Sequence, residues 1–222
     1  MSQVRLIAFT QPIELEGVQT GEELVAYCAR VSNPGNQANH ETAPRLLNYL
    51  TRNHHWSPFE MAHAVIEITT TRDIARQILR HRSFSFQEFS QRYAEVDAEP
   101  IMRETRLQDT KNRQNSLEVH DVELNAKWQS LQANVAKLTQ QSYQWAIDNG
   151  IAKEVARSVL PEGMTPSRLY MAGSVRSWIH YIQHRAGNGT QKEHREIAVM
   201  CRLALLHVMP SLEEILNATQ DH

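Results

Sequence analysis

One stretch of fourteen residues, Arg80 to Tyr93, constrains this chain more than any other, and it reads RHRSFSFQEFSQRY. It combines three arginines and a histidine with three phenylalanines, a glutamate and five serine or glutamine side chains. A buried segment cannot hold three guanidinium groups without anionic partners, because unpaired buried charge is costly. We therefore expect a partner that is anionic and flat, with phosphates on the arginines and aromatic rings on the phenylalanines. The plainer alternative is a helix-to-strand junction with a solvated basic edge.

The sequence predicts that this stretch begins in a helix. Thr71 and the two residues after it are typical of a helix start, and the helical pattern ends at Ser83. Gln77 and Arg80 lie three residues apart, so both project from one side of that helix.

Beyond Phe86 an extended chain is expected. In a strand, Glu88, Ser90 and Arg92 would alternate onto one face. At about 3.3 Å per residue these three positions span about 13 Å, close to the length of one mononucleotide. The segment is therefore expected to present a nucleotide-sized row of polar groups.

The order of residues in this stretch resembles the signature of flavin-dependent thymidylate synthases. That signature is Arg-His-Arg, seven further residues, then Ser and Gln-Arg-Tyr, and it matches residues 80–82 and 90–93. The fuller family pattern also places a serine and an Asn-Glu pair inside the window, where this chain has Ser85, Gln87 and Glu88. Gln87 departs from the usual asparagine but keeps its amide.

A second segment, His55 to Glu60, resembles the family motif His-x-[Ser/Thr]-Pro-x-Glu. The resemblance implies that this segment lies against the flavin, with the hydroxyl of Ser57 as a ligand. The residues alone predict a capped helix start, with Ser57 at the N-cap and Pro58 at the first helical position. Both can hold, because helix N-termini bind phosphate.

Two further segments follow in the family's order. Residues 155–161 resemble Val-Ala-Arg-x-x-Leu-Pro, which implies that Arg157 contacts nucleotide phosphate; without the resemblance, an exposed helical arginine is as good an interpretation. The family has flavin contacts at the start of the segment 175–185 and a substrate-facing arginine, here Arg185, at its end. Ser174 and His180 replace the usual asparagines, and residues 187–189 lack the family's frequent histidine.

The resemblance implies a homotetramer that binds FAD at its subunit junctions. It implies methylation of dUMP to dTMP, with methylenetetrahydrofolate as carbon donor and NADPH as reductant. The implied nucleotide site comprises Gln77, Ile78, Leu79, Arg80, Glu88, Phe89, Ser90, Gln91, Arg92, Arg157 and Arg185. The implied flavin site comprises His55, Ser57, Arg80, His81, Arg82, Glu88, Ser174, Val175, Arg176 and His180.

The chemistry of that reaction needs electron density at carbon 5 of uracil. A thiolate could supply it, but neither Cys28 nor Cys201 has polar or basic neighbours that would lower its pKa, and both are expected to be core residues. The other route polarises the ring with cations and takes hydride from a reduced flavin. We expect Arg185 to be the catalytic residue that stabilises negative charge on the uracil, and Ser90 to be a ligand rather than a nucleophile.

The rest of the chain predicts a single α+β domain over residues 1–222, with a modest antiparallel sheet packed against long helices. Strands are expected at 5–10, 64–70 and 164–171, and helices at 22–31, 43–53, 124–149, 153–160, 175–185 and 191–209. Residues 99–116 are interpreted as a mobile excursion whose Arg103, Arg106, Lys111 and Arg113 are solvated. The helix 124–149 carries a long apolar seam that also suits packing between subunits.

The composition sets limits on partners and location. A net charge of −2 gives no global basic field, and we expect no nucleic-acid partner. We expect no membrane association and a cytoplasmic location, since no apolar run reaches the length of a membrane span, no signal peptide is recognisable, and two lone cysteines suit a reducing compartment.

Two other classes of protein remain possible at this stage. A single-strand nucleic-acid binder would use the same arginines and phenylalanines, and its mark would be strongly salt-dependent binding of oligonucleotides. A metal-dependent nucleotide hydrolase would use the histidines at 54, 55 and 63, or His180 with His184. Their spacing gives no recognised ligand set, so no metal site is expected.

Overall fold

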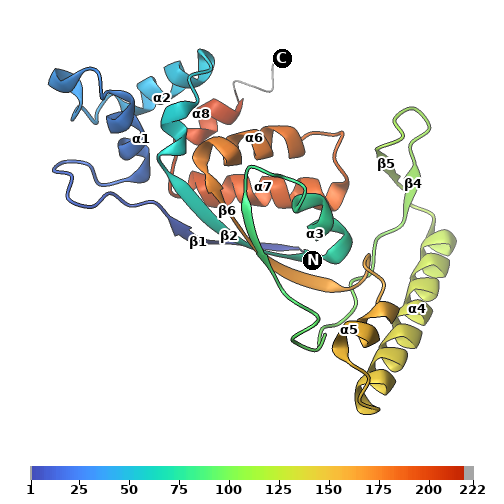
Figure 1. Cartoon of the computed structure of the whole chain (residues 1–222). Coiled ribbons are helices and arrows are strands. Elements are labelled where there is room, and N and C mark those ends of the chain that lie inside the picture. The colour runs from blue at the N-terminus through green and yellow to red at the C-terminus, as the bar shows by residue number, and fades with distance from the viewer. Residues whose placement is uncertain (1, 218–222) are drawn as a thin grey trace.

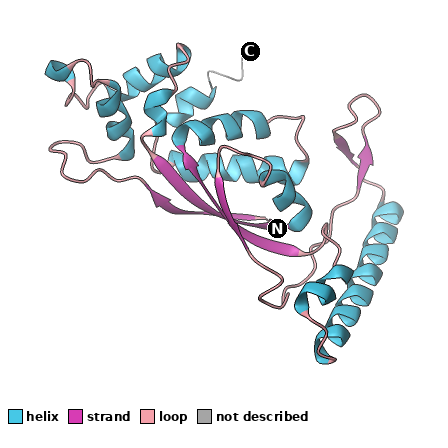
Figure 2. Cartoon of the chain, viewed as in Figure 1, coloured by secondary structure: helices cyan, strands magenta, loops and turns pink. Residues whose placement is uncertain are grey.

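A four-stranded antiparallel sheet forms the centre of the molecule, with the strand order β1-β2-β6-β3. The computed structural model describes residues 2–217; Met1 and residues 218–222 of the expected 1–222 domain lie outside them. The strands are β1 (Gln3–Phe9), β2 (His63–Thr71), β3 (Ser85–Glu88) and β6 (Pro166–Ser174). Helices cover one face of this sheet, as Figure 2 shows. The predicted α+β class and modest antiparallel sheet are confirmed.

The central strand β2 shows why the sheet has one covered face. Its side chains alternate, so Ala64, Ile66 and Ile68 are fully or almost fully buried, while the residues between them are only partly covered. On the other face Glu67 pairs with Arg5 of β1. Alternation of this kind is the mark of an antiparallel sheet with a single apolar face.

Three helices lie on the apolar face: α3 (Arg72–Ile78), α6 (Val175–Arg185) and α7 (Lys192–Leu206). The sequence places α6 at its observed bounds and α7 within three residues of its observed ends. Trp178, Ile179 and Ile182 of α6 are buried in the core, as is Cys201 of α7. Helix α3 follows β2 directly, and α6 follows β6 directly, so each of these strands continues into the helical layer on the apolar face.

A second group of helices covers one end of the sheet (Figure 1): α1 (Gly21–Ala29), α2 (Ala43–Arg52), the 3₁₀ helix η2 (Ser57–Glu60) and α8 (Leu212–Asn217). Thr20 and Glu23 form a capping box at the start of α1. Ser57 does not cap η2, because it is the first residue of that helix and no side chain bonds to the free amides there. The expected N-cap role of Ser57 is therefore wrong, and α8 was not expected from the sequence.

An arm projects from the sheet on the far side of these helices (Figure 1). It consists of the long helix α4 (Val122–Asp148), the short helices α5 (Lys153–Ala156) and η3 (Arg157–Val159), and a hairpin of β4 (Arg106–Gln108) and β5 (Ser116–Glu118). The predicted long helix is confirmed, but its apolar seam is open. Between 40% and 65% of each seam residue is exposed, at Leu124, Trp128, Leu131, Val135, Leu138 and Trp145.

The expectation of an extended chain through Arg92 is wrong. Strand β3 ends at Glu88, and the backbone N–H groups of Tyr93 and Ala94 both donate to the carbonyl of Ser90 in a turn. Phe89 makes the last backbone hydrogen bond to β6, through Arg168, and the turn at Ser90 then takes the chain away although β6 itself continues to Pro166. Glu88, Ser90 and Arg92 thus do not share one strand face.

The phenylalanines of the central stretch have a partner other than the flat ligand expected for them. Phe84 is buried against Trp178, with ring centroids 4.8 Å apart, and Phe86 packs against the same core. Gly173 makes this possible, because a Cβ at that position would come within 2.5 Å of the Phe84 ring. Phe84 and Phe86 therefore pack against the protein core, and the arginines of the stretch do not share that partner.

Within residues 2–217, no helix combines the length and the apolar character needed to cross a bilayer.

We expect Gly173→Ala to lower the free energy of unfolding by about 1–3 kcal/mol, the usual cost of overpacking a core. The reason is the contact with Phe84, which leaves no room for a methyl group. Denaturant unfolding of the purified variant measures the change. Gly35→Ala is the matched control, since no atom lies within 4 Å of a Cβ there, and it should change stability by less than about 0.5 kcal/mol. Equal unfolding midpoints for the two variants would contradict this packing.

Candidate active site

The start of α6 contacts the segment His55 to Glu60, and both were expected to contact the flavin. The side chain of Ser174 accepts a hydrogen bond from the backbone N–H of Ser177 and so caps the helix. Arg176, the second residue of the helix, pairs with Glu60 of η2. The ring of Trp56 meets His180 edge-on at 4.6 Å between centroids. Residues that are more than a hundred positions apart in the chain therefore form one corner of the site.

A hollow of about 490 Å³ opens between this helix and the turn that follows α3. Its walls include His81, Ser83 and Phe84 from the turn, and His180 and His184 from α6. His81 and His180, from two separate motifs, thus face the same space. Partial burial lowers the pKa of His180, and the neighbouring Arg176 lowers it further. An imidazole of this kind is neutral at pH 7 and can donate and accept hydrogen bonds.

Arg185 and His81 form the central contact of the site. The Nε of Arg185 donates to Nε2 of His81 at 3.0 Å. Burial lowers the pKa of His81 to about 4, with a further contribution from the Arg185 charge. Because His81 is therefore neutral, it can accept this bond. The contact uses only the Nε donor of Arg185. It leaves the two Nη groups, which form the fork that pairs with anions, for a ligand.

Gln77 lies behind this pair, among polar side chains of α6 and α7. Its Nε2 donates to Oε1 of Gln191 at 2.8 Å. His194, which is fully buried, places its two ring nitrogens beside Gln77 and the hydroxyl of Tyr181. Burial lowers the pKa of His194 to about 3, with Arg185 and His81 as further causes. Tyr181, Gln191 and His194 were missed by the sequence analysis as site residues.

Glu88 is held at the end of β3. One of its oxygens accepts from the hydroxyl of Ser167 at 2.7 Å, and the same oxygen lies 3.5 Å from Nη1 of Arg72. Both partners were also missed, because nothing in their local sequence indicates that they meet Glu88.

Two of the arginines expected to bind phosphate lie in or beside the arm. Arg92, in the turn after β3, pairs with Glu154 of α5 at 3.2 Å, and Arg157 begins η3. Figure 1 shows α5 beside α4, well away from α6. Within one chain, then, the structure does not bring Arg92 and Arg157 together with Arg185.

The remaining predicted residues differ in what they can offer to a ligand. Ile78 and Val175 are buried in the core, whereas Arg80 and Arg82 are exposed. His55 is exposed and lies edge-on to Tyr49. Further along, Leu79, Phe89 and Ser90 are partly buried, and Gln91 is buried with its Nε2 unpaired.

The expectation that Arg103 and Arg106 are solvated charges is wrong. Arg103 donates to Thr71 at 2.6 Å and pairs with Asp73 and Glu193. Arg106 pairs with the same Glu193, which lies 87 positions away in the sequence. A contact across that separation leaves no local signal, so sequence periodicity could not reveal it. Lys111 and Arg113 are exposed, as expected.

The cysteines are unsuited to a thiolate mechanism. Burial raises the pKa of both thiols, strongly for the fully buried Cys201 and less for the half-buried Cys28. The hydroxyl of Ser90 accepts from the N–H of Arg92, a contact that does not activate it as a nucleophile. In the part of the chain that is described, no three His, Cys, Asp or Glu side chains gather as a metal ion would require.

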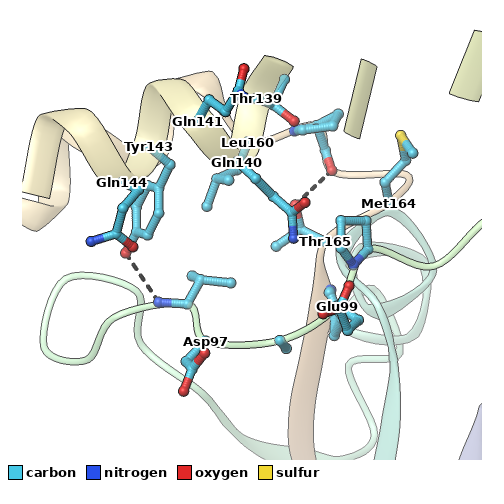
Figure 3. A pocket seen from close by; sticks show the side chains of 15 residues that line it. Asp97, Glu99, Thr139, Gln140, Gln141, Tyr143, Gln144, Leu160, Met164 and Thr165 are labelled. Atoms are coloured by element: carbon cyan, nitrogen blue, oxygen red, sulfur yellow. Dashed lines mark hydrogen bonds between the residues drawn. The ribbon is translucent and has the colours of Figure 1, made fainter. Parts of the chain in front are cut away.

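Another cavity, of about 400 Å³, lies between α4, residues 96–100 and residues 160–166 (Figure 3). Tyr143 closes one side of it by accepting a hydrogen bond from the backbone N–H of Val96. Its walls contain Asp97 and Glu99 but no lysine, arginine or histidine. That charge does not suit a phosphate, and no residue of the expected nucleotide or flavin sites lines this cavity.

Comparisons with known proteins agree with the motifs. The family model described as "Thymidylate synthase complementing protein" matches residues 14–211. A flavin-dependent thymidylate synthase of Synechocystis sp. is 51% identical over 96% of this chain and 99% of its own length. A probable flavin-dependent thymidylate synthase of Paramecium bursaria Chlorella virus 1 is 48% identical over 96% of this chain and 98% of its own.

The fold of the whole chain is also similar to that of a solved structure. The UMP/dUMP methylase PolB of Streptomyces cacaoi, in its structure with 5-Br dUMP, superimposes with a TM-score of 0.83 at 27% sequence identity. The match covers 98% of this chain and 95% of that one. The resemblance seen in the sequence is thereby confirmed, and the chain belongs to the family of flavin-dependent thymidylate synthases.

Proposed function

We propose that this FAD-dependent thymidylate synthase converts dUMP to dTMP with methylenetetrahydrofolate as carbon donor and NADPH as reductant. We propose further that it acts as a homotetramer in the cytoplasm. The observation that carries the reaction is the contact between Arg185 and a neutral His81 at the edge of the hollow. The description of PolB as a UMP/dUMP methylase bound to 5-Br dUMP supports the substrate, and two free cysteines suit a reducing compartment.

The donors around the hollow fit a flavin. Exposed arginines at positions 80 and 82 suit a pyrophosphate, and the rings of His81 and His180 provide a surface for a flat heterocycle. When bound there, FAD would supply the hydride for the reduction. The proposed flavin contacts are His55, Ser57, Arg80, His81, Arg82, Glu88, Ser174, Val175, Arg176 and His180.

Arg185 is proposed to act on the uracil ring. Methylation at carbon 5 builds negative charge on the ring and its carbonyl oxygens, and a fixed guanidinium fork is suited to stabilise that charge. His81 accepts a hydrogen bond from Nε of Arg185 and so fixes the guanidinium group. The Nη groups of Arg185 therefore need no reorganisation as the charge develops. Because His81 is neutral, it does not add a second positive charge that would repel Arg185.

The other nucleotide contacts are proposed from position. Arg80, Arg92 and Arg157 would meet the phosphate, and Gln77, Glu88, Ser90 and Gln91 would place the nucleotide. Glu88 is suited to a hydroxyl of the sugar, since a carboxylate only accepts hydrogen bonds. The buried Ile78, and with it Leu79 and Phe89, would contribute main-chain groups.

The homotetramer is supported by two features of the single chain. Arg157 lies in the arm and Arg92 contacts it, whereas Arg185 lies over the sheet, so one chain by itself does not assemble the proposed contacts (Figure 1). The seam of α4 is exposed along its length, although its residues follow the spacing of a helix-packing stripe. A second copy of the chain would both cover the seam and bring the missing arginines to the site.

The proposed reaction is tested directly with the purified protein. We expect flavin absorbance after incubation with FAD, and dTMP formation when dUMP, methylenetetrahydrofolate and NADPH are all present. Leaving out each substrate in turn should abolish dTMP. If the protein shows no flavin absorbance, the cofactor assignment is wrong; if flavin-loaded protein makes no dTMP, the reaction is wrong.

Arg185→Ala and Arg157→Ala should differ in which kinetic constant they change. A contact to developing ring charge is stronger in the transition state, so Arg185→Ala should lower turnover at saturating dUMP by roughly 100- to 1000-fold. A phosphate contact is equally strong in both states, so Arg157→Ala should mainly raise KM. Arg185→Lys should recover only part of the activity, because it lacks the planar fork. Normal turnover of Arg185→Ala with a raised KM would make Arg185 a binding residue only.

The seam of α4 is tested by changing its charge. Leu131→Glu with Leu138→Glu should dissociate the oligomer, because two carboxylates would be buried without partners. Ala126→Glu with Ala133→Glu is the matched control, since these residues are exposed on the same helix but away from the seam. Light scattering gives the mass and circular dichroism the helix content. A folded seam variant that keeps the mass of the unmodified protein would show that the subunits meet elsewhere.

A further inference from the structure

A chain of five polar side chains runs behind the hollow from Glu193 to Tyr181. Gln191 donates to Glu193 at 2.9 Å, and Gln77 donates to Gln191 at 2.8 Å. His194 lies next, with Nδ1 3.4 Å from Oε1 of Gln77 and Nε2 3.2 Å from the hydroxyl of Tyr181. His194 and Tyr181 are at most 1% exposed, so water does not compete for these contacts.

The carboxylate at one end fixes the direction of every bond in the chain. Burial alone would raise the pKa of Glu193, but its own backbone N–H, Arg103, Gln191 and Arg106 together lower it. Glu193 is therefore an acceptor only, and Gln191 must turn its NH₂ group toward it. The oxygen of Gln191 then faces Gln77, so Gln77 must present its own NH₂ group there.

The same reasoning continues to the histidine. With its NH₂ group toward Gln191, Gln77 turns its oxygen to His194, and an amide oxygen cannot donate. Nδ1 of His194 must therefore carry the proton. Because the neutral ring has one N–H, Nε2 accepts from Tyr181. Only one arrangement of donors and acceptors satisfies all five side chains.

We propose that Glu193 and His194 are positioning residues that hold the amide of Gln77 in a single orientation for the nucleotide. This inference rests on the proposed function, in which Gln77 contacts dUMP. A free amide can turn over, which exchanges its donor and its acceptor; the fixed amide keeps one N–H and one lone pair in constant places. Arg103 and Arg106 extend the same chain into the arm, because both pair with Glu193.

The tautomer of His194 gives a test that does not depend on activity. In protein labelled with ¹⁵N at histidine, NMR should show His194 neutral and protonated at Nδ1 at pH 6, where an ordinary histidine is mostly charged. Comparison with His194→Asn assigns the signal. A ring protonated at Nε2 or at both nitrogens would overturn the proposed direction of the chain.

Substitution separates positioning from packing. His194→Leu removes the N–H to Gln77 and should raise the dUMP KM and Kd about tenfold, the effect of one lost hydrogen bond, with turnover at saturating dUMP little changed. His194→Asn places an N–H near Nδ1 and should recover most of the affinity. His207→Leu, at the exposed C-cap of the same helix, is the control.

The outcomes distinguish this inference from the proposed function. If His194→Leu binds dUMP like the unmodified protein, or if His194→Asn is no better than His194→Leu, the positioning role is wrong. If the unmodified protein binds dUMP but makes no dTMP, the reaction is wrong, while dUMP binding by the variants still decides the role of His194. Thermal unfolding of each variant identifies a change that reflects only a loss of folded protein.

Discussion

The pairing of β2 with β6 is the constraint on which the site depends. The two strands are antiparallel over nine residues, so Thr71 lies opposite Pro166 and His63 lies opposite Ser174. The helices that follow them, α3 and α6, therefore begin at opposite ends of the same pair and run back over the same face. At about 1.5 Å per residue their lengths sum to about 27 Å, close to the length of the strand pair at about 3.3 Å per residue. Their C-terminal ends meet, and there Arg185 contacts His81.

The meeting of two helix ends also explains the charge state of the site. Helix C-termini carry partial negative charge and favour cations such as Arg185. The same place is buried, and it is more costly to charge a buried imidazole than to leave it neutral. His81 and His194 both have their pKa lowered, to about 4 and about 3, with burial as the largest cause and Arg185 as the next. Arg185 is thus a charged guanidinium beside neutral hydrogen-bonding rings, an arrangement that suits its proposed role of stabilising charge on the uracil ring.

Local patterns predicted most of the fold and the positions of the motifs. Alternation gave β2 to within one residue at each end, and the apolar spacing of α6 gave its observed bounds. The predictions that failed concern features that depend on contacts between residues far apart in the sequence. Strand β3 ends because the chain leaves β6 and turns at Ser90, and Phe84 is in the core because Gly173 leaves room for its ring. Arg103 resembles any solvated arginine until Asp73 and Glu193 are placed beside it.

Long-range contacts also connect the arm to the rest of the molecule. Arg103 and Arg106 join its base to Glu193, while Gln129 and Gln132 of α4 hold the backbone of Arg103. The arm is therefore tied to the same carboxylate that orients Gln77, although Arg157, farther along the arm, and Arg92, which contacts the arm, are remote from Arg185. In the proposed homotetramer, covering the seam of α4 would fix the arm of each subunit. The same contact that delivers phosphate-binding arginines to a neighbouring site would then also restrain, through Glu193, the amide at the subunit's own site.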